Sequence, residues 1–121
     1  MDRITLRGVR AYGRHGYDSD EREQRQPFDV EVVAEIDLQG AAASDDISQT
    51  LNYAWLHRRI VAIVSTTSYK LIERLAADLI AVVFEDRRVK RAQVTVSKPE
   101  ILAGATPSVT LERDNPRYET R

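Results

Sequence analysis

Lys98 is the residue of this sequence whose position most clearly suggests chemistry. In the stretch AQVTVSK, apolar residues stand at every second position from Ala92, and Lys98 continues that alternation. An ammonium group brought among apolar side chains loses hydration, which favours release of its proton and suits it to carry protons near neutral pH. The alternative is that the strand ends before Pro99 and the lysine extends into solvent. The spacing alone leaves both interpretations open.

Glu73 is a carboxylate within an otherwise largely apolar helical stretch, YKLIERLA, which spans residues 69–76. A negative charge near a helix N-terminus is stabilised by about 0.3–1 kcal/mol through the helix dipole, which explains the residue without any function. On a helical wheel Glu73 lines up with Ile80 and Phe84, along one side of the apolar stripe. A carboxylate there can also accept hydrogen bonds from a bound molecule, so Glu73 is a second candidate site residue.

Three further residue types deserve consideration. Tyr53 opens a predicted helix on its apolar side, where most tyrosines are core residues with one satisfied hydroxyl. Glu21 lies in the polar run DSDERE, where a carboxylate is usually solvated. His15 fits a turn and His57 a helix surface, and neither has a partner at the spacing of a metal site. No phosphate-binding loop, dinucleotide-binding fingerprint, nucleophile elbow or zinc-protease pattern occurs.

The predicted elements that must position these residues are strands and helices in a simple order. Alternating apolar residues predict strands over residues 3–12, 28–38, 92–98 and 108–113. Gly8 indicates a β-bulge or a close backbone approach, and the long polar loop 13–27 is of a kind that often carries function. Helical spacing predicts one helix from Asn52, a good N-cap, and a second over about 70–86. The order β-β-α-α-β-β indicates an α+β fold, an antiparallel sheet of about four strands with two helices on one face.

Composition narrows the class of protein and its partners. The 121 residues carry 18 Lys+Arg and 19 Asp+Glu, and this balance predicts neither a nucleic-acid nor a membrane partner. The sequence has no cysteine, which excludes a disulfide or a sulfur-ligated metal. The start MDRITLRG lacks the apolar region of a secretory signal, so we expect a cytoplasmic protein. We expect one domain over residues 1–113, a polar tail over 114–121, and a benefit from self-association for so small a chain.

Four segments together resemble the dihydroneopterin aldolase family, over about residues 3–113. HGYDSDEREQRQPFDVEVV resembles the family's histidine–glycine loop and second strand, and SDDISQTLNY resembles the segment that leads to a helix-start tyrosine. KLIERLA resembles its pterin-anchoring helix turn, and VTVSKP resembles the strand that ends in a catalytic lysine. Four segments in the right order and spacing are far more specific than any one of them.

This resemblance implies a tunnelling-type fold in which four subunits join their sheets into a ring-shaped barrel. Two such rings often stack into an octamer, and the sites lie between subunits. The resemblance also implies cleavage of 7,8-dihydroneopterin into 6-hydroxymethyl-7,8-dihydropterin and glycolaldehyde, a step of folate biosynthesis. It implies no cofactor, no metal and no Schiff base.

The resemblance further implies a role for each candidate residue. Glu73, with the backbone of Ile72, is expected to bind the pterin. Lys98 is expected to move protons through water as a general acid and base, while Tyr53 contacts the substrate and orients that water. Glu21, expected from a neighbouring subunit, would contact the substrate hydroxyls or the lysine.

Two other functions remain open at this point. An epimerase of dihydroneopterin or its triphosphate would share the lysine, the tyrosine and the pterin-binding glutamate, and Arg22 and Arg25 could then serve a triphosphate. A non-catalytic binding module on the same scaffold would not need an inward lysine. The segment KPEILAGA also departs from the family pattern, with Ile101 where alanine is usual and Ala103 where proline is usual, which affects loop shape and substrate preference.

Overall fold

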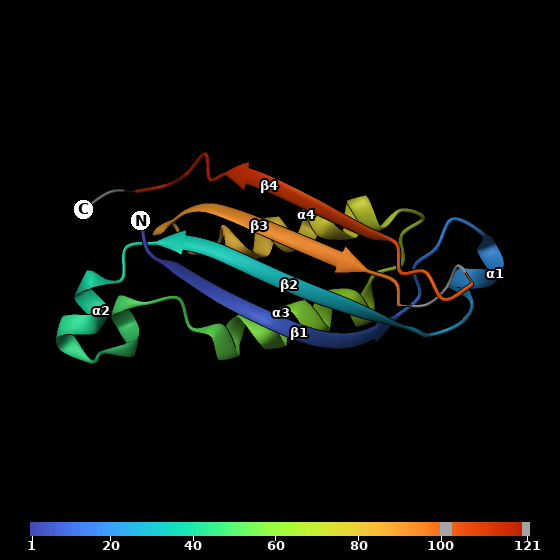
Figure 1. Ribbon diagram of the computed structural model, residues 1–121, viewed down its shortest axis with the longest axis horizontal. Helices are drawn as coiled ribbons and strands as arrows, with labels where there is room; N and C mark the ends of the chain where they lie inside the picture. The colour runs from blue at the N-terminus through green and yellow to red at the C-terminus, as the bar shows by residue number, and fades with distance from the viewer. Residues whose placement is uncertain (100–102, 120–121) are drawn as a thin grey trace.

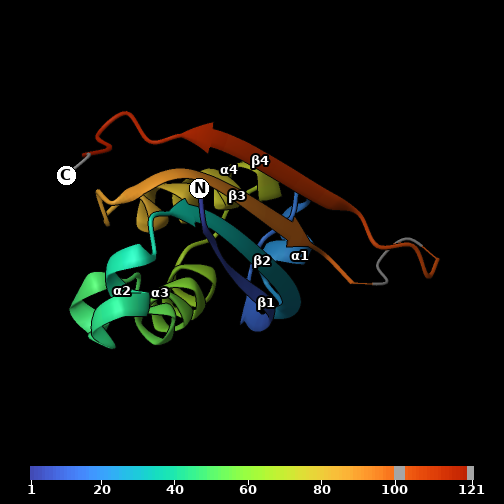
Figure 2. The same ribbon diagram turned by 60° about the vertical axis from the view of Figure 1, so that its left-hand side comes forward.

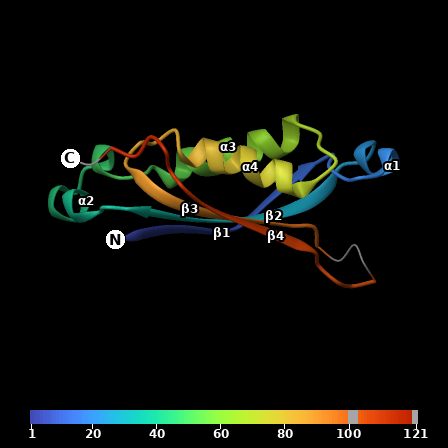
Figure 3. The same ribbon diagram turned by 90° about the horizontal axis from the view of Figure 1, so that it is seen from above.

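The structure, a computed structural model, describes residues 1–99 and 103–119. Its strands are β1 (Arg3–Gly13), β2 (Gln26–Ile36), β3 (Val89–Ser97) and β4 (Ser108–Asp114). Its helices are α1 (Ser19–Arg22), α2 (Gln39–Ser44), α3 (Tyr53–Thr66) and α4 (Ile72–Val83), with a 3₁₀ turn η1 (Ile47–Gln49). The strands form one antiparallel sheet in the order β1-β2-β3-β4, and α3 and α4 cover one of its faces (Figures 1 and 3). The predicted α+β class and the order of the main elements are confirmed.

The hydrophobic core lies between this sheet and the two long helices. Every second residue of β2 from Phe28 to Ile36 is buried, and the apolar residues of β3 that pair with them continue the same layer. The opposite face of the sheet is polar and carries ion pairs such as that between Arg10 Nε and Asp29 Oδ1, at 2.8 Å. Alternation along the strands therefore separates a helix-covered apolar face from a polar face, as the sequence predicts.

The first strand contains the irregularity that Gly8 predicts. The pairing of β1 with β2 shifts register between Leu6 and Val9, and Gly8 has a φ of 70°. That backbone conformation favours glycine because a side chain there would be strained. The bulge allows Val9 and Ala11 to continue the buried face after Leu6.

Side-chain capping explains where α3 begins, and backbone conformation explains where α4 begins and ends. The side chain of Asn52 accepts hydrogen bonds from the backbone N–H groups of Ala54 and Trp55, at 3.0 and 3.2 Å, so its predicted N-cap role is confirmed. The second helix is shorter than the predicted 70–86, because Leu71 is still extended and the turn that follows Val83 is not α-helical.

Other details of the structure differ from what the sequence patterns indicate. The second strand ends at Ile36, because Leu38 is followed by the short helix α2, and α1 forms inside the expected loop 13–27. Tyr53 lies on the same side of the helical wheel as Ile60, but its side chain is 61% exposed. The described part of the chain does not cover the first turn of α3 at that point, so Tyr53 is not a core residue.

The two ends of the sheet carry different segments. The N-terminus and α2 lie at one end, and α1 lies at the other (Figure 1). Figure 2 shows the twist of the sheet, with β1 and β4 as its two edge strands. In the described part of the chain, no helix is long and apolar enough to cross a membrane.

Candidate active site

Lys98 and Glu21 form the centre of the candidate site. Lys98 directly follows β3 on the face that the helices cover, its side chain is 11% exposed, and its Nζ lies 2.8 Å from Glu21 Oε2. Antiparallel pairing places the end of β3 beside the start of β2, and the loop that precedes β2 carries Glu21 in α1. The expectation that a neighbouring subunit supplies Glu21 to the lysine is therefore wrong, because the same chain brings both residues together.

The electrostatics of this pair favour an ionised carboxylate. The hydrogen bond from Lys98 holds the pKa of Glu21 below its ordinary value, against the opposing effect of desolvation. The backbone N–H of Asp18 also donates to Glu21 Oε1, at 3.4 Å, and Gln26 Nε2 donates to the Glu21 carbonyl, at 3.1 Å. Glu21 is thus fixed both at its side chain and at its backbone.

Glu73 and Ile72 lie in the first turn of α4. Leu71 is the N-cap residue and provides no side-chain cap, while Ile72 is buried and Glu73 is exposed. The backbone N–H groups of a helix's first turn create a positive local potential. A carboxylate at this position is favoured there, and its exposed oxygens are free to accept hydrogen bonds from a ligand.

A cleft of about 590 Å³ brings these residues together. Its lining comes from the loop after β1, the start of α4, the end of β3 and the start of β4, and consists of Tyr17, Glu21, Lys70, Leu71, Ile72, Glu73, Lys98, Pro107, Ser108 and Val109. Four of the five predicted site residues line this one cleft. Tyr17 and Lys70 also line the cleft and are not among the predicted site residues, although their positions next to the histidine–glycine pair and before the helix start could have indicated them.

Tyr53 is the predicted site residue that a single chain does not bring to the cleft. It is the first residue of α3, and a helix of 14 residues spans about 20 Å at 1.5 Å per residue. The cleft with Lys98 lies toward the other end of α3, where the chain turns into α4. Within one chain, Tyr53 therefore cannot contact a molecule bound beside Lys98.

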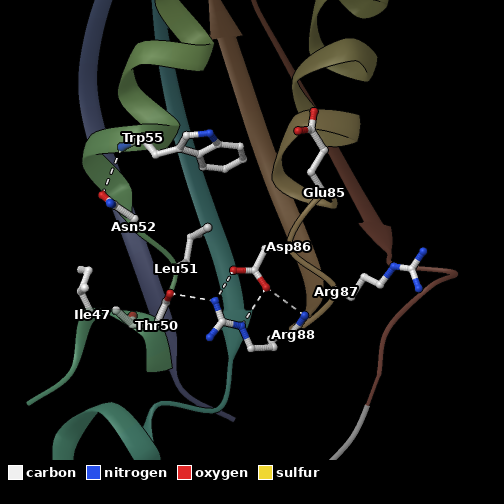
Figure 4. A pocket seen from close by; sticks show the side chains of 9 residues that line it. All are labelled: Ile47, Thr50, Leu51, Asn52, Trp55, Glu85, Asp86, Arg87 and Arg88. Carbon is white, nitrogen blue, oxygen red and sulfur yellow. Dashed lines mark hydrogen bonds and ion pairs between the residues drawn. The ribbon is translucent and has the colours of Figure 1, made fainter. Parts of the chain in front are cut away.

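A second cleft, of about 510 Å³, lies near the start of α3 and the end of α4 (Figure 4). Two of its charged groups, Asp86 and Arg88, pair with each other, while Glu85 and Arg87 pair with Arg59 and Glu119 outside the lining. The Arg88 guanidinium donates to both carboxylate oxygens of Asp86, at 3.0 and 2.8 Å, and to the carbonyl of Thr50, at 2.9 Å. Asn52, the residue before Tyr53, also lines this cleft.

His15 lies in the irregular segment that follows β1, and its side chain is buried in the core, which the sequence does not predict. Its side chain is 0% exposed, its Nε2 lies 2.9 Å from the Val64 carbonyl oxygen, and its Nδ1 accepts from the Tyr69 N–H at 3.0 Å. Burial, the largest cause, lowers the pKa of this histidine. His57 is exposed on α3, as predicted. The described residues hold no group of three or more histidine, aspartate or glutamate side chains suited to a metal ion.

The structure also bears on the residues that flank the cleft. Arg22 Nη1 donates to the carbonyls of Gly16 and Tyr17, at 2.9 and 2.7 Å, so its guanidinium is engaged by the loop. Ala103 has a φ of 50°, which a proline ring could not adopt, so the usual proline is incompatible with this loop conformation. Ile101 lies outside the described residues.

Comparison with known proteins agrees with the resemblance seen in the sequence. A family model described as dihydroneopterin aldolase (FolB) matches residues 4–113. A dihydroneopterin aldolase from Streptomyces coelicolor is 38% identical over 100 residues, which cover 83% of this chain and 84% of that protein. One from Bacillus subtilis is 36% identical over 114 residues, which cover 93% and 95%.

A solved structure of E. coli dihydroneopterin aldolase in complex with neopterin has the same fold. It superposes with a TM-score of 0.88 at 24% identity and covers 93% of this chain and 99% of its own. The family model extends over nearly the whole chain and includes the cleft residues Glu21, Glu73 and Lys98. Together with the two bacterial relatives, this match shows that the chain belongs to the dihydroneopterin aldolase family.

Proposed function

We propose that this protein is a dihydroneopterin aldolase that cleaves 7,8-dihydroneopterin into 6-hydroxymethyl-7,8-dihydropterin and glycolaldehyde. The observation that carries the proposal is the cleft in which the Lys98–Glu21 pair faces the first turn of α4 with Glu73. Family membership agrees with it. Cleavage of this carbon–carbon bond without added water or redox change is a lyase reaction.

The pterin would bind to the start of α4. A pterin presents an amino group and a ring N–H side by side, and one carboxylate can accept both hydrogen bonds at once. Glu73 is exposed in the cleft and available for this contact, and the backbone of the buried Ile72 lies beside it. Such a pair of charge-assisted hydrogen bonds would fix both the affinity and the orientation of the ring.

The chemistry would be general acid–base catalysis. Removal of a proton from the side-chain hydroxyl next to the breaking bond releases glycolaldehyde, and the bonding electron pair moves into the C=N bond of the dihydropterin ring. Protonation of the resulting enamine-like carbon completes the second product. Lys98, held by Glu21, would pass these protons through a water molecule. Because the ring itself accepts the electron pair, the reaction requires neither a Schiff base nor a metal.

Tyr53 would reach the cleft from a neighbouring subunit. The cleft is bounded by Ser108 and Val109 of β4, which is an edge strand, and the opposite edge of the sheet is β1. Helix α3 packs against β1, so a neighbour that pairs its β1 with β4 would bring its own α3 to this side. The high exposure of Tyr53 agrees with such a role, in a ring of four subunits or a stacked pair of rings.

The decisive experiment is incubation of the purified protein with 7,8-dihydroneopterin and separate quantification of glycolaldehyde and of the epimerised substrate. The proposal expects glycolaldehyde as the main product, with any epimer as a minor product. Epimer without glycolaldehyde would instead establish an epimerase. The structure gives no support to Arg22 as a triphosphate ligand, because its guanidinium already donates to two loop carbonyls.

A further inference from the structure

Both ring nitrogens of the buried His15 side chain take part in hydrogen bonds. The Tyr69 backbone N–H donates to Nδ1, at 3.0 Å, so the imidazole proton is on Nε2 and is donated to the Val64 carbonyl, at 2.9 Å. The ring also packs edge-on against Phe28, with centroids 5.1 Å apart. His15 is therefore satisfied only as the neutral Nε2–H tautomer.

Two further hydrogen bonds join the same two chain segments. The Gly16 N–H donates to the Tyr69 carbonyl, at 2.9 Å, and the Ser68 hydroxyl donates to the Arg14 carbonyl, at 2.6 Å. Residues 14–16 and 68–69, linked in this way, are called the loop clasp below. The clasp connects the loop that follows β1 with the segment that precedes α4.

The α4 side of the loop clasp is fixed independently of His15. The Tyr69 hydroxyl donates to the Asp78 carboxylate, Arg74 Nε donates to the same carboxylate at 3.2 Å, and the Arg74 guanidinium lies 4.8 Å from the centre of the Tyr69 ring. These contacts tie Tyr69 to the helix that begins with Ile72. Loss of His15 would therefore release mainly the other side of the clasp, the loop.

The loop side of the clasp determines where Glu21 lies. A Cβ atom added to Gly16 would lie 2.5 Å from the Cβ of Glu21, so the two residues are packed as closely as their atoms allow. Arg22 ties the same turn to α1 through its bonds to the Gly16 and Tyr17 carbonyls. A displacement of Gly16 would thus move Glu21, and Glu21 holds Lys98.

We propose that the neutral imidazole of His15 is a positioning residue, which holds Glu21 against Lys98 through the loop clasp and does not touch the substrate. The effect on catalysis rests on the proposed function, whereas the effect on the loop does not. The structure assigns to this buried histidine a role in the geometry of the cleft, beyond filling space in the core.

Protonation would open the loop clasp. A charged imidazole presents an N–H at both nitrogens, so Nδ1 would face the Tyr69 N–H donor to donor. Lys98, which is itself paired with Glu21, is the charged group that acts on the ring, and the Tyr69 ring lies beside it with centroids 5.7 Å apart. Within the described residues no carboxylate is hydrogen-bonded to the imidazole to offset its charge. Burial and the charge of Lys98 lower the pKa of His15, so the clasp is complete above the ordinary value of 6.5 and is lost as pH falls through the lowered value.

Three variants separate positioning from packing. Asparagine can place an acceptor near the Nδ1 position, glutamine can place a donor near the Nε2 position, and His57→Gln on the exposed face of α3 is the control. We expect His15→Gln to lower kcat about 10- to 100-fold, the effect of a displaced catalytic group, with KM changed less than about threefold. His15→Asn should retain kcat within about threefold of the wild type, since it preserves the contact to Tyr69.

A double-mutant cycle with Glu21 distinguishes a positioning role of His15 from a purely structural one. If His15 acts through Glu21, adding His15→Gln to Glu21→Gln should lower kcat further by less than about twofold, because the group it positions is already gone. An equal fold loss in both backgrounds would overturn the proposal and leave His15 with a purely structural role.

Amide hydrogen exchange tests the loop clasp without reference to any reaction. The Gly16 and Tyr69 amides should exchange faster in His15→Gln than in the wild type and in His57→Gln, while amides of the central strands stay unchanged. In the wild type, the same two amides should lose protection relative to those strands as pH falls from 6.5 through the lowered pKa of His15, which keeps the test available if the variant fails to fold. Unchanged protection in both cases would contradict the proposal, even if the protein did not cleave dihydroneopterin.

Discussion

The Lys98 ammonium lies 2.8 Å from the Glu21 carboxylate, although 77 positions separate the two residues in the chain. Strand pairing brings them together, because β3 ends where β2 begins and the loop before β2 carries Glu21. No periodic pattern in β3 or in the loop before β2 predicts that the two side chains meet. The geometry of this pair makes the cleft testable by substitutions that remove one charge at a time.

Replacing Lys98 with alanine is expected to lower kcat for dihydroneopterin cleavage by at least about 100-fold, because the proposed proton carrier is removed. Glycolaldehyde release under saturating substrate measures the effect. Lys90→Ala, an exposed lysine at the other end of β3, is the matched control and should retain full activity. Full cleavage by Lys98→Ala would remove the lysine from the mechanism.

Glu21→Gln is expected to remove a pH-dependent part of the stability. Because Lys98 lowers the folded-state pKa of Glu21 below its ordinary 4.5, the pair stabilises the protein above that pH and ceases to do so as pH falls through the lowered pKa. The variant should be less stable than the wild type by about 0.5–1 kcal/mol at pH 7, and equally stable in strong acid.

Urea unfolding across the acid range measures this difference. Glu23→Gln, at the exposed end of the same short helix, is the control and should show no such convergence. A destabilisation of Glu21→Gln that stays constant with pH would mean that the ion pair is not its cause.

Glu73→Ala is expected to weaken pterin binding by about 10- to 100-fold, which corresponds to the loss of hydrogen bonds to a charged group. Calorimetric titration with the product 6-hydroxymethyl-7,8-dihydropterin gives the dissociation constant without turnover. Glu35→Gln, on the polar face of the sheet and away from the cleft, should bind as the wild type does. An unchanged constant for Glu73→Ala would exclude its role as the pterin anchor.

Mixing two inactive variants tests whether Tyr53 acts across a subunit boundary. Tyr53→Ala and Lys98→Ala should each be nearly inactive alone, because each lacks one part of every site. If subunits exchange at random in a ring, up to about a quarter of the sites would combine an intact cleft with an intact tyrosine from a neighbour. Activity should then return on co-refolding, whereas a mixture that stays inactive while forming mixed rings would place Tyr53 outside the site.

Periodic patterns predicted the parts of the fold that periodicity controls. The alternation in β2 and β3 indicated the buried face correctly, and it placed Lys98 on that face. The N-cap role of Asn52 and the irregularity at Gly8 were likewise predictable, because each depends on neighbours in the sequence.

Other features depend on contacts between distant segments and escaped prediction. His15 is buried because Val64 and Tyr69 satisfy its nitrogens, and no local signal indicates partners about 50 residues away. The family resemblance implied that a neighbouring subunit supplies Glu21, and the polarity of the loop could not correct this, because it does not specify the path that brings Glu21 to Lys98 of the same chain. Tyr53 has the helical spacing of a core residue, but exposure depends on what covers the first turn of its helix, which spacing does not specify.

The two edge strands have a consequence for handling the protein. β1 and β4 each end the sheet with a row of backbone N–H and C=O groups directed away from it. Each edge is a template on which a strand of another chain can form a ladder, so conditions that dissociate the proposed ring would leave both edges open and favour aggregation. Substitutions at these edges should consequently appear first as losses of solubility, before any loss of chemistry in the cleft.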